Sequence, residues 1–84
     1  MRAKAIARLK FPSEKHSGII YEALMPEIEK PATVRSRANL EKAREFLILK
    51  IEAGDTVALR AALNAYLRWI KSMLGVLEVL ENAS

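Results

Sequence analysis

The C-terminal third of the chain has a helical pattern that is apolar on more than one side. At about 100° per residue, one apolar stripe comprises Leu59, Leu63, Tyr66, Leu67, Ile70, Leu74 and Leu77. A second stripe beside it comprises Ala58, Ala62, Ala65, Trp69, Met73, Val76 and Leu80. Together they span roughly 200° of the helix, whereas a helix that covers only its own core needs about 100°. One stripe is enough for this domain, and the other predicts a partner.

Spacing alone leaves open which stripe faces the rest of the domain. We expect the stripe from Leu59 to Leu77 to face inward and the alanine-rich stripe to face the partner, although Trp69 would also fit the domain's own core. The candidate partner-binding residues are Ala58, Ala62, Asn64, Ala65, Arg68, Trp69 and Met73. Asn64 is a mediocre helix former, so its mid-helix position suggests a specific hydrogen bond across a subunit contact. The alternative is a solvated polar stripe of Arg60, Asn64, Arg68 and Lys71.

The long helix has a clear start and an unusual length. Asp55 precedes it and is a good N-cap, because its carboxylate can accept a hydrogen bond from the first-turn amides. No proline interrupts the pattern before about Glu81, so the helix is roughly 40 Å long. A compact chain of this size has a diameter on the order of 30 Å. We therefore expect the helix to overhang its own domain.

Upstream, the chain alternates between strand and helix patterns. Residues 3–11 alternate small or apolar residues with basic ones, which predicts a strand. Pro12 ends it, Ser13 is a plausible N-cap, and a helical pattern follows until Pro26 bends or ends the helix. Residues 27–32 are expected to form a loop that contains the charge pair Glu27 and Glu29.

Two more strands follow this loop. Residues 34–40 alternate and are expected to end in a charged turn at residues 41–45. In the next strand Leu47, Leu49, Ile51 and Ala53 point one way, and Phe46, Ile48, Lys50 and Glu52 point the other. The pattern predicts an α+β fold of order β-α-β-β-α, with a three-stranded antiparallel sheet and two helices on one face. Without a linker or repeat, we expect a single domain over residues 1–84.

Length and composition favour association with another subunit. A chain of 84 residues buries only about 60 to 65% of the surface that its unfolded form exposes, so its stability is marginal. It has no cysteine, which excludes disulfides and thiolate metal sites. It also lacks an apolar signal core and any apolar run near the roughly 20 residues that span a bilayer. We expect a cytoplasmic protein that makes no contact with membranes.

The net charge of +4 comes from Arg2, Lys4, Arg8 and Lys10, which precede the first acid and are expected on the side of the sheet away from the helices. The candidate nucleic-acid-binding residues on that side are Arg2, Lys4, Arg8, Lys10, Arg35, Arg37 and Lys50. Such a face suits a phosphate backbone, since several cations neutralise neighbouring phosphates together. The alternative is an ordinary solvated face, on which Glu41 and Glu52 are the only acids. Ile6, Phe46 and Ile48 lie on the same side, which favours cover by a second sheet or chain over part of it.

The sequence offers little catalytic chemistry. It contains one histidine, one aspartate and no cysteine, whereas metal sites and nucleophilic triads need several such groups together. We expect His16 to be a packing or surface residue and the three scattered glycines to form no phosphate-binding loop. The prediction is a protein that is not an enzyme and holds no metal or cofactor.

Two segments and the order of elements resemble a known family. Residues 34–37, Val-Arg-Ser-Arg, and residues 58–70, Ala-Leu-Arg-Ala-Ala-Leu-Asn-Ala-Tyr-Leu-Arg-Trp-Ile, resemble the Pcc family. This family supplies the smallest subunit of the archaeal and eukaryotic KEOPS complex and is related to human cancer/testis antigens. The resemblance covers nearly the whole chain. Position 65 is alanine where the family often has serine, which puts a hydroxyl-mediated contact there in doubt.

The resemblance implies a non-catalytic, archaeal-type scaffold subunit of the complex that places threonylcarbamoyladenosine in ANN-decoding tRNAs. It implies a homodimer in which two sheets join and the helices lie on one side. There each protomer would pack against the ATP-dependent threonylcarbamoyltransferase subunit, and the dimer would help to hold the tRNA. The alternatives are a stand-alone nucleic-acid-binding or transcription-associated module, for which the sequence offers no helix-turn-helix, and a small hydrolase, for which it lacks titratable groups.

Overall fold

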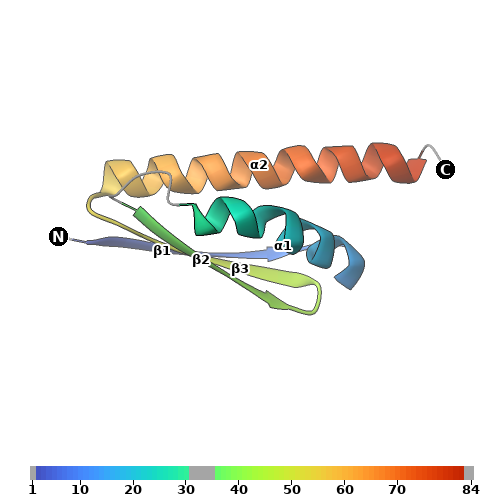
Figure 1. Ribbon diagram of the computed structural model, residues 1–84, viewed down its shortest axis with the longest axis horizontal. Coiled ribbons are helices and arrows are strands. Elements are labelled where there is room, and N and C mark those ends of the chain that lie inside the picture. The colour runs from blue at the N-terminus through green and yellow to red at the C-terminus, as the bar shows by residue number, and fades with distance from the viewer. Residues whose placement is uncertain (1, 31–35, 83–84) are drawn as a thin grey trace.

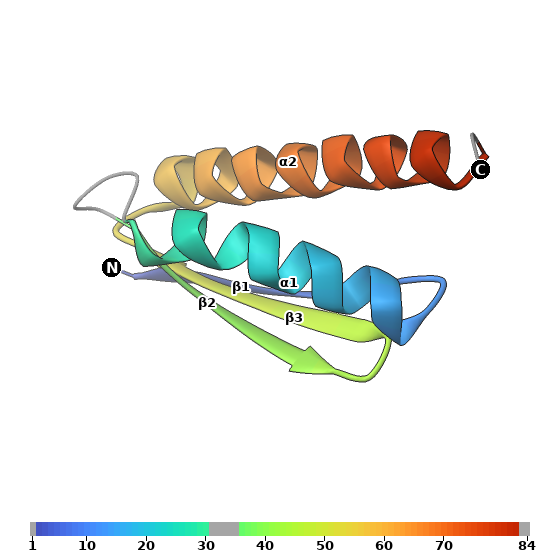
Figure 2. The same ribbon diagram turned by 45° about the vertical axis from the view of Figure 1, so that its right-hand side comes forward.

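The computed structural model describes residues 2–30 and 36–82, and its elements follow the predicted order β-α-β-β-α (Figure 1). The elements are β1 (Ala3–Lys10), α1 (Glu14–Glu29), β2 (Ser36–Ala43), β3 (Phe46–Ala53) and α2 (Thr56–Asn82). The strands form one antiparallel sheet of order β1-β3-β2. Both helices cover the same face of this sheet, so the predicted α+β fold is confirmed (Figures 1 and 2).

The core lies between the sheet and the helices. The central strand β3 contributes Leu47, Leu49 and Ile51, each at most 1% exposed, because its alternating pattern points every second side chain towards the helices. These side chains pack with Ile20 and Leu24 of α1. The remaining buried members of the cluster are Phe11, Ile28, Leu40 and Ile70. The predicted inner and outer faces of the three strands are confirmed for the part of the chain that the structure describes.

Helix α1 is longer than predicted. Ser13 is its N-cap and accepts a hydrogen bond from the His16 backbone N–H at 3.3 Å. The helix continues through Pro26 to Glu29, so the prediction of a loop was wrong for residues 27–29. A proline removes one backbone donor but keeps its carbonyl, and the Pro26 carbonyl accepts from the Lys30 N–H at 3.3 Å. One further turn therefore forms, and residues 31 and 32 lie outside the described residues.

Strand β2 also runs further than predicted. It extends to Ala43 and pairs with β3, so the expected turn at residues 41–45 is reduced to Arg44 and Glu45. Arg44 adopts a left-handed backbone with φ of 56°. The buried Ser17 hydroxyl donates to the Arg44 carbonyl at 2.6 Å, which fixes the turn against α1. The predicted start of this strand, at Val34 and Arg35, lies outside the described residues.

Helix α2 begins and overhangs as the sequence predicts. The Asp55 carboxylate accepts the Ala58 N–H at 2.7 Å, which confirms the N-cap. The helix comprises 27 residues, and the molecule measures 48 × 21 × 18 Å. The C-terminal part of α2 extends past the sheet, and Glu81 in its last turn contacts His16 in the first turn of α1 (Figure 1). None of the helices in the described residues is both long enough and apolar enough to cross a membrane.

Candidate functional site

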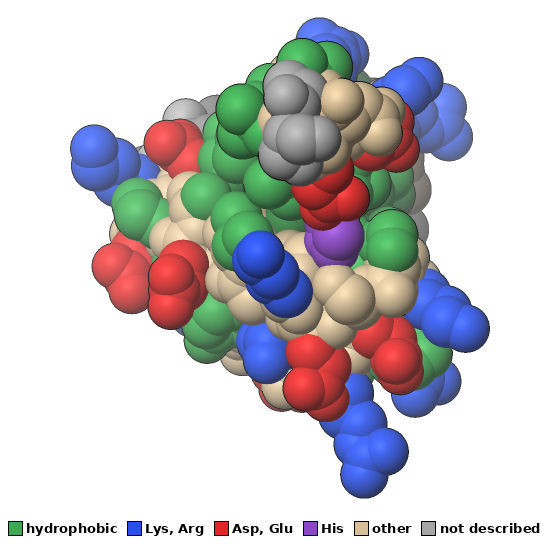
Figure 3. Space-filling view, turned by 90° about the vertical axis from the view of Figure 1, so that its right-hand side faces the viewer, with side chains coloured by type: hydrophobic (Ala, Val, Ile, Leu, Met, Phe, Trp, Pro, Cys, Tyr) green, Lys and Arg blue, Asp and Glu red, His purple; other side chains and the backbone are tan. Residues whose placement is uncertain are grey.

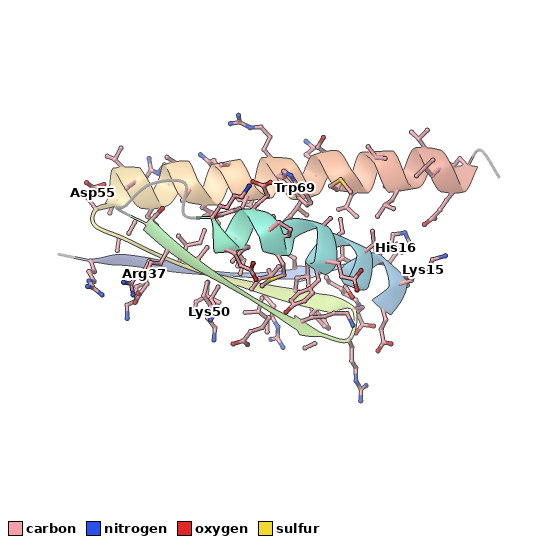
Figure 4. All side chains as sticks on the ribbon, viewed as in Figure 1. Lys15, His16, Arg37, Lys50, Asp55 and Trp69 are labelled. Carbon is pink, nitrogen blue, oxygen red and sulfur yellow. The ribbon has the colours of Figure 1, made fainter. Side chains whose placement is uncertain are left out.

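Two surfaces of the described chain carry the residues that the sequence singles out. The first is the outer surface of α2, which faces away from the sheet. The second is the sheet face that no helix covers, here called the open face. The labelled side chains of Arg37 and Lys50 project from this open face, away from both helices (Figure 4). The two surfaces therefore lie on opposite sides of the protein.

Most of the apolar surface of α2 is only partly covered. Ile70 is its one buried residue among those the structure describes. Val57, Val76, Val79 and Leu80 are 78, 50, 67 and 62% exposed, respectively. Large apolar side chains in water are ordinary when scattered, but three of these cluster within one C-terminal turn and a half. The helix thus has the excess apolar surface that its pattern predicts.

The expected orientation of the second stripe was wrong in part. Ala62, Trp69 and Met73 pack against the hydrophobic core, and Trp69 points from α2 towards the layer beneath it (Figure 4). The cause is the position of these residues around the helix axis. Met73, for example, lies only about 60° from the buried Ile70 and so flanks the inner face. Trp69 and Met73 are half-buried, and each keeps part of its surface exposed.

The other candidate partner-binding residues are more accessible. Asn64, Ala65 and Arg68 are exposed and Ala58 is half-buried. Ala65 lies about 140° around the helix from Ile70, so it faces away from the core. Asn64 makes no side-chain hydrogen bond within the described chain, so its suggested hydrogen bond across a subunit contact stays a prediction.

The overhanging end of α2 is held by a contact that the sequence does not reveal. His16 Nε2 lies 2.5 Å from Glu81 Oε1, and its Nδ1 lies 2.7 Å from the Ser13 hydroxyl. Figure 3 shows the histidine directly beneath the end of α2, next to acidic and apolar side chains. His16 is therefore a packing residue, as expected, with the specific role of joining the start of α1 to the end of α2. No local signal could have found it, because the two residues are 65 positions apart.

The open face brings the predicted cations together. Lys4, Arg8 and Lys10 point outward from β1, Arg37 from β2 and Lys50 from β3. Arg2 is exposed just before β1, and Arg35 lies outside the described residues. The register places Lys4, Glu52 and Arg37 in one row across the sheet, and Ile6, Lys50 and Asn39 in the next.

Some of these cations are already paired. Lys4 Nζ lies 3.1 Å from Glu52 Oε1, and Lys50 Nζ lies 3.2 Å from Glu41 Oε1. The hydrogen bond and the charge of Lys4, helped by the charges of Arg2 and Arg37, lower the pKa of Glu52. The Arg8 guanidinium lies over the Phe46 ring, 5.2 Å from its centroid. Among the described residues, the open face carries six cations and two carboxylates, so its net charge is positive.

Neither surface contains a catalytic arrangement in the part of the chain that the structure describes. No group of three or more His, Cys, Asp or Glu side chains there could hold a metal ion. What these surfaces offer is binding: apolar area on one side of the protein and positive charge on the other.

Comparisons with known proteins identify relatives of this chain. The family model described as "Transcription factor Pcc1" matches residues 4–78. The KEOPS complex subunit Pcc1 of Pyrococcus abyssi is 38% identical over 71 residues, which are 84% of this chain and 87% of that protein. A solved chain described as "Crystal structure of binary complex Gon7-Pcc1" shares the fold, with a TM-score of 0.80, 15% identity and coverage of 93% of this chain and 95% of that one. The family match and the identity over most of both chains place this chain in the Pcc1 family.

Proposed function

We propose that the protein is a non-catalytic subunit of a KEOPS complex and that it supports threonylcarbamoyladenosine modification of ANN-decoding tRNAs in the cytoplasm. The observation that carries the proposal is the 38% identity to the KEOPS subunit Pcc1 over 84% of the chain. The protein acts as a single domain over residues 1–84. It forms a homodimer, binds the threonylcarbamoyltransferase subunit through its helices and contacts tRNA through the open face.

Dimerisation is supported by the edges of the sheet. β1 and β2 are its two edge strands, and each has an outer side that pairs with no other strand among the described residues. Edge-to-edge pairing of two copies gives one of these outer sides in each copy a strand partner, and it keeps the helices of both copies on one side. Light scattering of the isolated protein tests this, with a dimer expected at micromolar concentration and a monomer contradicting it.

Docking of the transferase subunit on α2 is supported by the exposed apolar surface of that helix. Trp69 is a poor probe of this contact because it also packs against the core. Ala65 is the better probe, since it is exposed and faces away from the core. We expect Ala65→Arg to leave the fold and the dimer intact but to abolish co-purification with the transferase subunit, because a long charged side chain separates the two helical surfaces.

Ala43→Arg is the matched control for this experiment. Ala43 is also exposed, but it lies at the end of β2, away from α2. The control should co-purify as the wild type does. Equal complex formation by both variants would show that the transferase subunit docks elsewhere.

Contact with tRNA is supported by the positive open face. We expect a Lys4, Arg8 and Arg37 triple alanine variant to weaken tRNA binding and to reduce the slope of log K against log salt by about 2 to 3, as each lost phosphate contact lowers it by about 0.7 to 0.9. The control is a Lys15, Lys30 and Lys71 triple alanine variant, which removes the same charge from exposed positions outside the open face. Identical slopes for both variants would rule out the open face as the tRNA contact.

A stand-alone nucleic-acid-binding or transcription-associated module is the second candidate, favoured by the description of the matching family. It predicts tight, salt-sensitive binding of nucleic acid by the isolated protein without other KEOPS subunits. The described elements form no helix-turn-helix that could enter a DNA groove. Binding measured with and without the transferase subunit separates the two candidates.

A further inference from the structure

The open face has an apolar strip in the middle of its charges. The strip consists of Ile6 on β1 and of Ile48 and Phe46 on β3. Ile6 is 70% exposed, whereas Ile48 and Phe46 are half-buried. The register pairs Ile6 with Lys50, Ile48 with Arg8, and Phe46 with Lys10, so the strip runs diagonally across three successive rows of the sheet. Each of its members is therefore next to a cation.

A shallow hollow of about 540 Å³ opens at the Ile6 end of the strip. Its outward-facing lining includes three cations, Lys4, Arg37 and Lys50, with Asn39 as a neutral polar group and Glu52 as the one carboxylate, which pairs with Lys4. The Asn39 amide can both donate and accept hydrogen bonds, as the edge of a nucleobase requires. The hollow thus combines an apolar wall, a base-compatible amide and cations for phosphate within one site.

We propose that the open face binds an unpaired segment of RNA, with bases against the apolar strip and phosphates on the flanking cations. The inference rests on the proposed contact with tRNA and goes further, because it states which form of the RNA is bound. An extended single strand exposes base faces and phosphates together, and side chains that stack on bases bind it with little sequence preference.

Duplex RNA fits this surface less well. Its bases are stacked inside the helix, and it presents phosphates and riboses to a flat protein face. A duplex would satisfy the cations of the open face but would leave the exposed Ile6 without an apolar contact. The apolar strip is therefore the feature that distinguishes an unpaired segment from a paired one.

The ion pairs on the open face leave its lysines available. Lys4 and Lys50 pair with Glu52 and Glu41 at exposed positions, where such pairs contribute little and are screened by salt. A phosphate can therefore replace either carboxylate as the partner. The Arg8 guanidinium lies over the Phe46 ring, 5.2 Å from its centroid, and a base can share this cation–π contact.

A second copy of the chain is the rival occupant of the strip. Face-to-face association would bring two positive surfaces together, because six described cations face only two carboxylates on each copy. Charge complementarity therefore favours a polyanion over a second copy. An uncharged substitution at Ile6 should then change RNA binding without changing the oligomeric state.

The test compares Ile6→Ser with Ile19→Ser in the full-length protein. Ile19 is also an exposed isoleucine, but it lies on α1, far from the open face. Binding of a fluorescent ten-nucleotide oligouridylate and of a ten-base-pair RNA duplex is measured at one salt concentration. We expect wild type to prefer the oligouridylate, and Ile6→Ser to weaken that complex by about tenfold, because the variant loses the apolar contact of one aliphatic side chain with a base. Binding of the duplex, and both complexes of Ile19→Ser, should match wild type.

A second measurement uses the wild-type protein alone. Titration with oligouridylate should shift the Ile6 methyl NMR signals through the ring current of a stacked base, while the Ile19 methyl signals stay in place.

If the duplex binds as tightly as the single strand, or if Ile6→Ser binds the oligouridylate normally, the inference is wrong although the open face still binds RNA. If the triple alanine variant at Lys4, Arg8 and Arg37 also binds normally, the proposed tRNA contact fails with it. If light scattering shows that Ile6→Ser dissociates a dimer, a second copy occupies the strip and the inference is overturned.

Discussion

The two helices of this protein lie on the same face of one sheet, yet they are buried to very different extents. α1 has 16 residues and buries Ser17, Ile20, Leu24 and Ile28, which follow one another at helical spacing. α2 has 27 residues and, within the described chain, buries only Ile70. α1 is therefore an ordinary amphipathic helix whose apolar stripe is used by its own fold. α2 carries apolar surface that the sheet does not cover.

The cause of this difference is position relative to the sheet. α1 lies over β2 and β3 along its length, and Ser17 fixes its first turns to the β2–β3 turn. α2 lies over the sheet with its N-terminal part and then continues beyond it (Figures 1 and 2). A helix can therefore belong to a small fold and still have most of its surface left uncovered by that fold.

The largest expected effect comes from comparing a buried residue of α1 with an exposed residue of α2. Leu24→Ala on α1 should lower the free energy of unfolding by about 3 kcal/mol, because it leaves a cavity among fully buried side chains. Val79→Ala on α2 removes an exposed side chain and should change it by less than about 0.5 kcal/mol. Urea unfolding of both variants measures these values. Equal losses would mean that the end of α2 is as well packed as α1.

A smaller effect is expected at the start of α2. Asp55→Ala removes the acceptor of the Ala58 N–H and should lower the free energy of unfolding by about 1 kcal/mol. Asp55→Asn is the control, because asparagine is an equally good N-cap and should keep most of that stability. If both variants are as stable as wild type, the cap adds nothing to a helix start that packing already holds.

The strands and caps of this fold could be predicted because they depend on nearby residues. The alternation in β3 assigned Leu47, Leu49 and Ile51 to the core, and these are the most buried side chains in the sheet. Asp55 was identified as a cap from its position alone. Patterns of this kind act over one turn or one strand, so the sequence displays them directly.

The features that sequence reasoning missed depend on distant contacts. β2 extends to Ala43 because β3 pairs with it, and local charge gave no sign of this pairing. Trp69 turned out to pack against the core because its place on the helix flanks the inner face, a matter of packing that periodicity alone leaves open. The described cations lie on the predicted side of the sheet, but their partners, such as Glu52 for Lys4, follow from strand register.

The overhanging end of α2 should respond to loss of its contact with α1. His16→Ala removes the contact with Glu81 and should destabilise the end of α2 by about 0.5 kcal/mol, because Glu81 is exposed and water screens its side of the pair. Amide hydrogen exchange at residues 77–82 should then become about twice as fast, while residues 60–65 exchange as before. Lys15→Ala is the control on the same exposed turn. Unchanged exchange in His16→Ala would show that apolar contacts alone hold this end.

The smallest expected effect is a change in the pKa of Tyr66, which lies on α2 and senses a charge on α1. Burial, and to a lesser extent the negative charge of Glu27 on α1, raise the pKa of the Tyr66 phenol on α2. The folded protein therefore retains this proton above the pH at which the unfolded chain loses it. The stabilisation is complete below about pH 10, the ordinary tyrosine value, and is lost as pH rises through the higher folded value.

Glu27→Gln should therefore lower the pKa of Tyr66 without returning it to the ordinary value, because burial, the larger cause, remains. Ultraviolet titration of tyrosinate measures this in a Tyr21→Phe background, which leaves Tyr66 as the single tyrosine. Glu29→Gln, on the same helix, is the control and should leave the titration unchanged. If Glu27→Gln also leaves it unchanged, Tyr66 does not sense the charge of α1. The two helices would then be less closely packed in solution, and even more of α2 would be free for a partner.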